Sequence, residues 1–250
     1  MFKENELRTY LFCSKLHSYG ASHIKEDLAF VLVKEALKTF LTLYSLSQLQ
    51  EKNITVSKLI KQSISAALDC LPPDKQIASQ KLFYRNYISH WFSYFVKDEK
   101  LKDKAFFSAY YSTKYNYRSL FVLLEFLALA FDKKKKTLYA YSFNESLDSY
   151  LSNHDAVNIL KYSFLKENFP KYKNIVLITC SCSSNIISNN TNYPNRSNYK
   201  KFLSTCLDSP KHITVLNHLN SKYKERTIAR IPACFNKGCP KRKVCLNDPW

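Results

Sequence analysis

Apolar residues recur at helical spacing through the N-terminal part of the chain. Four stretches show this pattern: residues 5–19, 22–50, 56–71 and a fourth that begins near residue 74. Gly20 ends the first stretch, and Pro72-Pro73 stop the third because proline cannot continue a helix. The pattern predicts a short N-terminal helix followed by a block of about three helices.

The pattern changes after residue 118. Residues 119–131 (SLFVLLEFLALAF) and 137–143 (TLYAYSF) have strand character, and the charged segment 132–136 joins them as a hairpin turn. A helical stretch at 153–168 follows, and then NIVLITC at 174–180, which is typical of a buried strand. Hairpin, helix and strand in this order predict an α/β fold around a mixed sheet.

A polar segment and a basic tail complete the chain. Residues 181–198 are rich in Asn and Ser and predict a loop. We therefore divide the chain into four parts: residues 1–20, an N-terminal helix with one cysteine that joins the core; 21–112, a helical subdomain; 113–195, an α/β core; and 196–250, a basic tail with a cysteine cluster.

The charge of the chain is strongly positive, with 38 Lys and Arg against 20 Asp and Glu and a formal net charge of +18. The tail has 12 Lys and Arg against 3 acids, so half of the excess lies in residues 196–250. A charge of this size attracts polyanions and predicts nucleic acid, DNA before RNA, as the partner. Only 2 glycines occur, which excludes the glycine-rich loops that bind phosphate in nucleotide-binding proteins.

No segment predicts a membrane span or export. The uncharged apolar runs are much shorter than the roughly 18 residues that a membrane-spanning helix needs. The N-terminal residues lack the basic and then apolar layout of a signal peptide. We therefore expect an intracellular, cytoplasmic protein with no membrane partner.

Aromatic and basic residues interleave in two stretches, a pattern that suits stacking on bases and contact with phosphates. The candidate nucleic-acid-binding residues are Lys114, Tyr115, Tyr117, Arg118, Tyr199, Lys200 and Lys201, joined in the tail by Lys241, Arg242 and Lys243. With 18 Tyr and 17 Phe in a lysine-rich chain, such neighbours also arise by chance, so both interpretations stay open. We interpret the lysine run of the hairpin turn, residues 133–136, as solvated rather than as a phosphate contact.

Three cysteines of the tail lie close together, as Cys234-x4-Cys239-x5-Cys245. Basic neighbours lower the pKa of a thiol and favour the thiolate form that binds metal. Three ligands leave a tetrahedral site one short, and thiolates suit either zinc or an iron–sulfur cluster. The candidates for a fourth ligand are Cys13, Cys180, Cys182, Cys206 and His212. The alternative is three unligated thiols in a basic tail.

The order of these features resembles a known family. A helix with the pattern Leu7-x2-Tyr10-x2-Cys13 precedes a helical block, a strand hairpin, a helix, a strand and the three-cysteine cluster. This order is similar to that of the RecB-like nucleases of the PD-(D/E)XK superfamily that carry an iron–sulfur cluster. They include the CRISPR-associated RecB-like exonucleases and the AddB nuclease domain. The resemblance covers most of the chain.

The resemblance implies a [4Fe–4S] cluster that clasps the two ends of a nuclease domain together. Its ligands would be Cys13, Cys234, Cys239 and Cys245. The family's usual spacing at the last three cysteines is C-x2-C-x5-C, whereas this chain has four residues in the first interval. Zinc is the alternative occupant.

The catalytic motif of the family is matched only in part. The family has an Asp on the first hairpin strand and (Asp/Glu)-x-Lys on the second, where the carboxylates hold Mg²⁺ or Mn²⁺. Here the first strand offers Glu125, and residues 137–143 contain neither acid nor lysine. The family's later Gln-x3-Tyr motif is matched loosely by Asn158-x3-Tyr162. The acidic segment 98–100 is expected in a charged loop.

These observations predict a DNA-binding protein of RecB-like nuclease fold with a cysteine-ligated cluster and weak or lost catalysis. It would act within a DNA-processing, recombination or mobile-element or defence complex. One alternative is a zinc-stabilised nucleic-acid-binding or transcription-associated subunit. Another is an active metal-dependent DNA exonuclease with displaced carboxylates, Glu125 with Glu145 or Asp148. Mg²⁺ or Mn²⁺ is expected only if the protein is active.

Overall fold

The computed structural model describes residues 1–4, 6–7, 28–51, 54–117, 120–132, 134–143, 156–182 and 199–204. Its helices are α3 (Leu28–Leu49), α4 (Val56–Asp69), α5 (Ala78–Asp98) and α6 (Ala156–Asn168), with 3-10 turns at Pro73–Lys75 and Leu101–Asp103. Its strands are β1 (Phe2–Lys3), β2 (Ala105–Tyr117), β3 (Leu120–Asp132), β4 (Thr137–Phe143), β5 (Asn174–Cys182) and β6 (Tyr199–Ser204). Within these residues, no helix has both the length and the apolar character that a membrane crossing requires.

The helices α3, α4 and α5 form one layer. Helix α4 begins after Thr55, whose side chain accepts a hydrogen bond from the Lys58 backbone N–H as an N-terminal cap. The layer is held together by aromatic rings. Phe40 of α3 packs against Phe92 and Phe95 of α5, with ring centres 5.3 and 6.1 Å apart and edge-to-face geometry.

The described strands form one mixed sheet of six. Strand β2 pairs antiparallel with β3 along one edge of β3. On the other edge, β1 pairs with the start of β3 and β4 pairs with its end. Strand β4 runs parallel to β5, and β5 runs antiparallel to β6. In the described sheet, β2 and β6 are therefore opposite edge strands, and the short β1 also pairs with one strand only.

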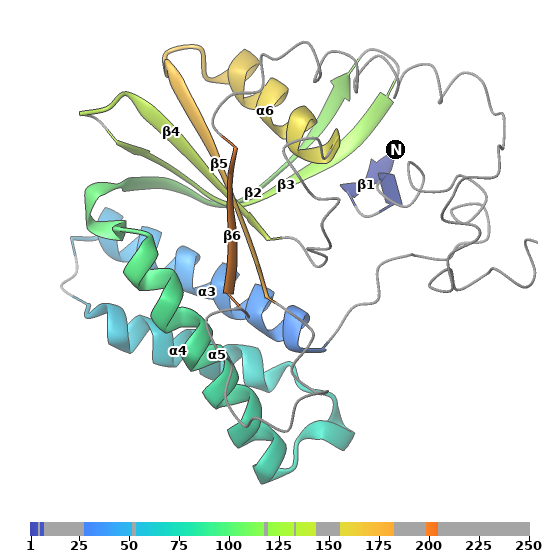
Figure 1. Ribbon diagram of the computed structural model, residues 1–250, viewed down its shortest axis with the longest axis vertical. Helices are drawn as coiled ribbons and strands as arrows, with labels where there is room; N and C mark the ends of the chain where they lie inside the picture. The colour runs from blue at the N-terminus through green and yellow to red at the C-terminus, as the bar shows by residue number, and fades with distance from the viewer. Residues whose placement is uncertain are drawn as a thin grey trace, which may run out of the picture.

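Helices cover both faces of the sheet (Figure 1). On one face, Tyr141 of β4 and Ile178 of β5 join the core of the three-helix layer. On the other, Phe126 of β3 and Leu177 of β5 pack with Leu160 of α6. Helix α6 connects the parallel strands β4 and β5, which need such a crossover. The predicted α/β fold with a mixed sheet is confirmed.

The apolar pattern does not predict β2. Its sequence, AFFSAYYSTKYNY, alternates aromatic and polar residues without an apolar run. A bulge between Phe106 and Ser108 and a left-handed φ of 40° at Tyr110 also interrupt the two-residue period. The boundary expected between residues 112 and 113 consequently falls inside a strand. The helix expected at 5–19 lies almost wholly outside the described residues.

Candidate functional site

Glu125 lies within β3, where the structure leaves it half-buried. Its Oε1 accepts a hydrogen bond of 3.2 Å from the hydroxyl of Tyr110 in β2. Lys38 of α3 lies with its Nζ 4.5 Å from the centre of the Tyr110 ring and 3.5 Å from the Glu35 carboxylate. Burial, and then the charge of Glu125, raise the pKa of Tyr110. The phenol is therefore held in the protonated form that donates to Glu125.

Tyr110 is also strained. Its φ of 40° is left-handed, which costs a residue with a Cβ about 1 kcal/mol or more. Its neighbours Ala109 and Tyr111 still pair with β3, so the strand continues past the kink. Strain of this kind gathers at functional sites, which makes the Tyr110–Glu125 pair the first described position to test for chemistry.

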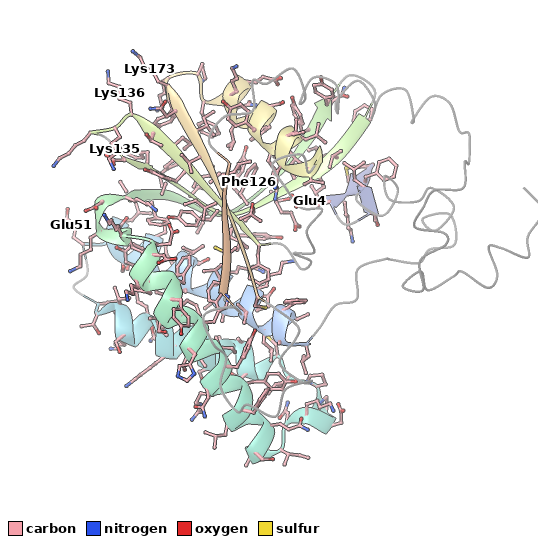
Figure 2. All side chains as sticks on the ribbon, in the orientation of Figure 1. Glu4, Glu51, Phe126, Lys135, Lys136 and Lys173 are labelled. Carbon is pink, nitrogen blue, oxygen red and sulfur yellow. The ribbon has the colours of Figure 1, made fainter. Side chains whose placement is uncertain are left out.

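A second carboxylate, that of Glu4, contacts the backbone of Glu125. Glu4 Oε1 accepts a hydrogen bond of 2.7 Å from the Glu125 N–H, between the part of β3 that pairs with β1 and the part that pairs with β4. Glu4 Oε2 lies 2.9 Å from Nζ of Lys161 on α6. Glu4, which is labelled beside β1 in Figure 2, thus joins the N-terminal segment to both β3 and α6.

Lys161 is a buried cation. Its side chain is 2% exposed, and its Nζ lies 5.4 Å from the centre of the Phe126 ring. Asn158, one turn earlier on α6, is buried too, and its Oδ1 has no hydrogen-bond partner among the described residues. The Asn158-x3-Tyr162 pair expected from the resemblance therefore lies on the helix that carries Lys161.

The described surroundings of Glu125 do not form a divalent-cation site. Among the residues that the structure describes, no three His, Cys, Asp or Glu side chains could hold a metal ion together. Both oxygens of Glu4 are engaged as described above. Near the end of β4, Tyr141 packs into the helical layer and the Ser142 hydroxyl lies 3.2 Å from that of Thr179. Glu145 and Asp148 lie outside the described residues, and a catalytic role for Glu125 stays a prediction.

The first aromatic and basic stretch is divided between the two faces of β2. Lys114 is exposed. Tyr115 is only 7% exposed, because it points toward α6 and donates a hydrogen bond of 2.9 Å to Glu167 Oε1. Tyr117 packs against the same core. Successive strand residues point to opposite faces, so the structure does not place Lys114 and the Tyr115 ring on one continuous surface. Arg118 lies outside the described residues.

The second stretch is far from the first within the sheet. Tyr199, Lys200 and Lys201 lie in β6, where their backbones pair with Cys182, Ser181 and Cys180 of β5. Strands β2 and β6 are opposite edges of the described sheet, so the structure does not bring the two stretches together. Lys241, Arg242 and Lys243 lie outside the described residues.

The cysteines expected to hold a cluster lie outside the described residues. These are Cys13, Cys234, Cys239 and Cys245. Two of the other candidates, Cys180 and Cys182, are buried in β5 on one face of the sheet, within the core shared with the helical layer. That placement gives both side chains an ordinary role in the apolar core. Cys70 is an exposed thiol at the end of α4.

Within the charged segment 98–100, Asp98 and Lys100 are exposed at the end of α5, whereas Glu99 turns inward. Glu99 is completely buried, and its Oε2 lies 2.6 Å from Nζ of Lys104. The Tyr141 hydroxyl donates a hydrogen bond of 2.8 Å to the same oxygen and accepts one of 2.7 Å from Lys104. The ion pair and these hydrogen bonds offset the cost of burying the two charges, and they link the end of α5 to β4.

Two structural features are not predicted from the sequence. The burial of Lys161 had a signal, because Val157, Lys161 and Leu165 share the apolar stripe of α6 at four-residue spacing. The other is a row of rings beside the hairpin turn, which draws residues from three segments: β2, β3 and the connection between α6 and β5. These rings are Phe107, Phe131, Phe169 and Tyr172.

Comparison with known proteins leaves the family open. No protein-family model matches the chain, and no curated protein sequence matches it either.

Proposed function

We propose that the protein binds nucleic acid, DNA in the first instance, on a RecB-like nuclease fold whose catalysis is weak or lost. The observation that carries the proposal is that β3 supplies Glu125 while its neighbour β4 supplies no second carboxylate. A phosphodiester is hydrolysed in such folds by metal held between carboxylates, and one carboxylate holds divalent metal poorly.

The charge of the chain supports binding. A formal net charge of +18 is far more than solubility requires, and it favours association with a polyanion. The order of hairpin, helix and parallel strand agrees with the fold that the resemblance implies. By the same resemblance, a cysteine-ligated [4Fe–4S] cluster, or zinc in its place, would complete the protein, which would act within a DNA-processing, recombination or defence complex.

The test uses the full chain and fluorescently labelled DNA. Anisotropy titrations with single-stranded and duplex oligonucleotides at increasing salt should give affinities that fall steeply. The logarithm of affinity should fall by about 0.7 to 0.9 per contacted phosphate for each unit of log salt. No binding at low salt, or an affinity indifferent to salt, would refute the proposal.

A further inference from the structure

Four aromatic rings lie in a row where the β3–β4 hairpin turns. Phe107 is the extra residue at the bulge of β2, and it is 36% exposed. Its ring centre lies 6.2 Å from that of Phe169, after α6, and 5.8 Å from that of Phe131, at the end of β3. The Phe131 ring lies in turn 6.1 Å from that of Tyr172, before β5. Phe131, Phe169 and Tyr172 are all partly exposed.

Exposed lysines lie within five residues of three of these rings in the sequence. They are Lys134, Lys135, Lys136, Lys166, Lys171 and Lys173, and together with the four rings they make up what we call the hairpin-end surface. Thr137 pairs with Asn174, so Lys136 and Lys173 stand side by side at the starts of two adjacent strands. Figure 2 shows these two and Lys135 projecting outward at one end of the sheet. Lys171 Nζ lies 5.2 Å from the centre of the Tyr172 ring.

Two described acids of this region accept hydrogen bonds. Asp132 is buried, and its Oδ1 accepts hydrogen bonds of 2.9 and 3.1 Å from the backbone N–H groups of Lys134 and Lys135. It therefore builds the turn. Its Oδ2 also lies 3.9 Å from Lys135 Nζ, although the Lys135 side chain is still 73% exposed. Glu167 accepts the hydrogen bond from Tyr115. The hairpin-end surface consequently presents cations and aromatic faces together.

We propose that the hairpin-end surface binds single-stranded nucleic acid, with unpaired bases stacked on the exposed rings and phosphates held by the surrounding lysines. The proposal rests on the proposed function and locates it. A single strand is favoured over a duplex because only unpaired bases offer their faces to the rings. The lysines of the turn then have a role beyond solvation, contrary to the interpretation that the sequence favours.

The experiment separates stacking from charge. Phe107→Leu combined with Tyr172→Leu keeps apolar bulk but removes two rings. We expect it to weaken binding of a labelled oligothymidylate about tenfold or more, with duplex binding nearly unchanged. The control is Phe83→Leu on α5, since Phe83 is also 36% exposed. A variant that binds the oligothymidylate like the wild type, or loses single-strand and duplex binding equally, would overturn the stacking.

A second pair of variants does not depend on the rings. Lys136→Glu with Lys173→Glu should reduce affinity for the oligothymidylate and flatten its salt dependence. The matched control, Lys58→Glu with Lys61→Glu, makes the same charge change on the exposed side of α4. Equal losses in both double variants would overturn the location. Circular dichroism and thermal melting of every variant test whether the fold is retained.

The outcomes distinguish this inference from the proposed function. Wild-type protein that binds no nucleic acid overturns both. Wild-type protein that binds with steep salt dependence, while both hairpin-end variants bind as their controls do, overturns the location alone. Polyglutamate that binds the wild type as tightly as the oligothymidylate would show a surface for acidic polypeptide instead, and would overturn the choice of ligand.

Discussion

Glu4 and Lys161 form an ion pair of 2.9 Å in which the lysine side chain is 2% exposed and the glutamate side chain 12%. The pair joins the N-terminal segment to a helix near the end of the described core. It also leaves the other oxygen of Glu4 to accept the N–H of Glu125. One side chain therefore holds together three parts of the chain that are distant in sequence.

Loss of this pair should destabilise the fold. Lys161→Met leaves the Glu4 charge in a largely buried position without its partner, and we expect the free energy of unfolding to fall by about 3 kcal/mol. Urea denaturation measures the change. Lys166→Met, an exposed lysine on the same helix, should change it by less than about 0.5 kcal/mol. Similar effects of the two substitutions would contradict a stabilising role for the pair.

The double variant isolates the ion pair from packing. Glu4→Gln with Lys161→Met removes both charges, and the glutamine can still accept the N–H of Glu125. We expect it to be more stable than Lys161→Met alone, because no uncompensated charge stays buried. A double variant whose loss equals the sum of the two single losses would show that the charges do not interact.

Stability should depend on pH above 10 through Tyr141. Burial, followed by the charge of Glu99, raises the pKa of Tyr141 well above its usual value near 10 in the folded protein. The stability that this shift supplies is complete below pH 10 and is lost as the pH rises from 10 toward the folded pKa, because the unfolded state loses its proton first. Urea denaturation at increasing pH should show a smaller decline in Tyr141→Phe than in the wild type.

Other buried or half-buried tyrosines should also contribute to the decline in stability at high pH. Tyr139 and Tyr44 also have raised pKa values, with burial as the main cause, so some decline should persist in the variant. Tyr141→Phe also removes the hydroxyl that donates to Glu99, and it should cost about 1 kcal/mol or more at neutral pH. Identical pH dependence in the variant and the wild type would refute the assignment to Tyr141.

Glu125 should not support strong cleavage. With Mn²⁺ or Mg²⁺ present, we expect degradation of single-stranded DNA to be weak or absent. Glu125→Gln should change DNA affinity by less than about threefold, since it removes one charge from a half-buried position. Gel electrophoresis of end-labelled DNA measures the cleavage. Robust Mn²⁺-dependent degradation that disappears in Glu125→Ala would establish an active nuclease instead.

The hypothesis that cysteines from both ends of the chain bind one metal centre predicts equal loss of metal when either end is substituted. If Cys13 and Cys239 bind the same metal, then Cys13→Ser and Cys239→Ser should lose iron or zinc to the same extent. Elemental analysis and the visible absorption of the purified protein distinguish an iron–sulfur cluster from zinc. Cys70→Ser, at an exposed thiol, is the control. Full metal content in Cys13→Ser would remove the main support for the resemblance.

The elements that the sequence predicts well are those whose burial is local and continuous. Strands β3, β4 and β5 are apolar runs because both of their faces are covered, and α6 has a clear apolar stripe. The sequence pattern does not predict strand β2, because it is an edge strand with one exposed face, a bulge and a kink at Tyr110. Its polar and aromatic mixture therefore resembles a loop.

The candidate site is less predictable than the fold. Glu125 stands out as an acid in an apolar run, but its contacts with Tyr110 and Glu4 depend on a strand that the pattern hides. Charge and aromatic content suggest binding at Tyr115, whereas strand alternation turns that ring into the core. The hairpin-end rings come from three separate segments, so no single stretch of the sequence indicates that they lie together.

The pairing of β1 with β3 has a consequence for how the protein is made. Glu4 leaves the ribosome 121 residues before Glu125, the residue whose N–H it accepts. Helices α3, α4 and α5, by contrast, emerge beside their own packing partners and can assemble early. The contacts of Glu4 and β1 can therefore form only after β3 and α6 have been synthesised, and until then they do not protect this segment from proteases. Nascent chains stalled before β3 should lose their amino-terminal segment to proteases, whereas released chains should resist.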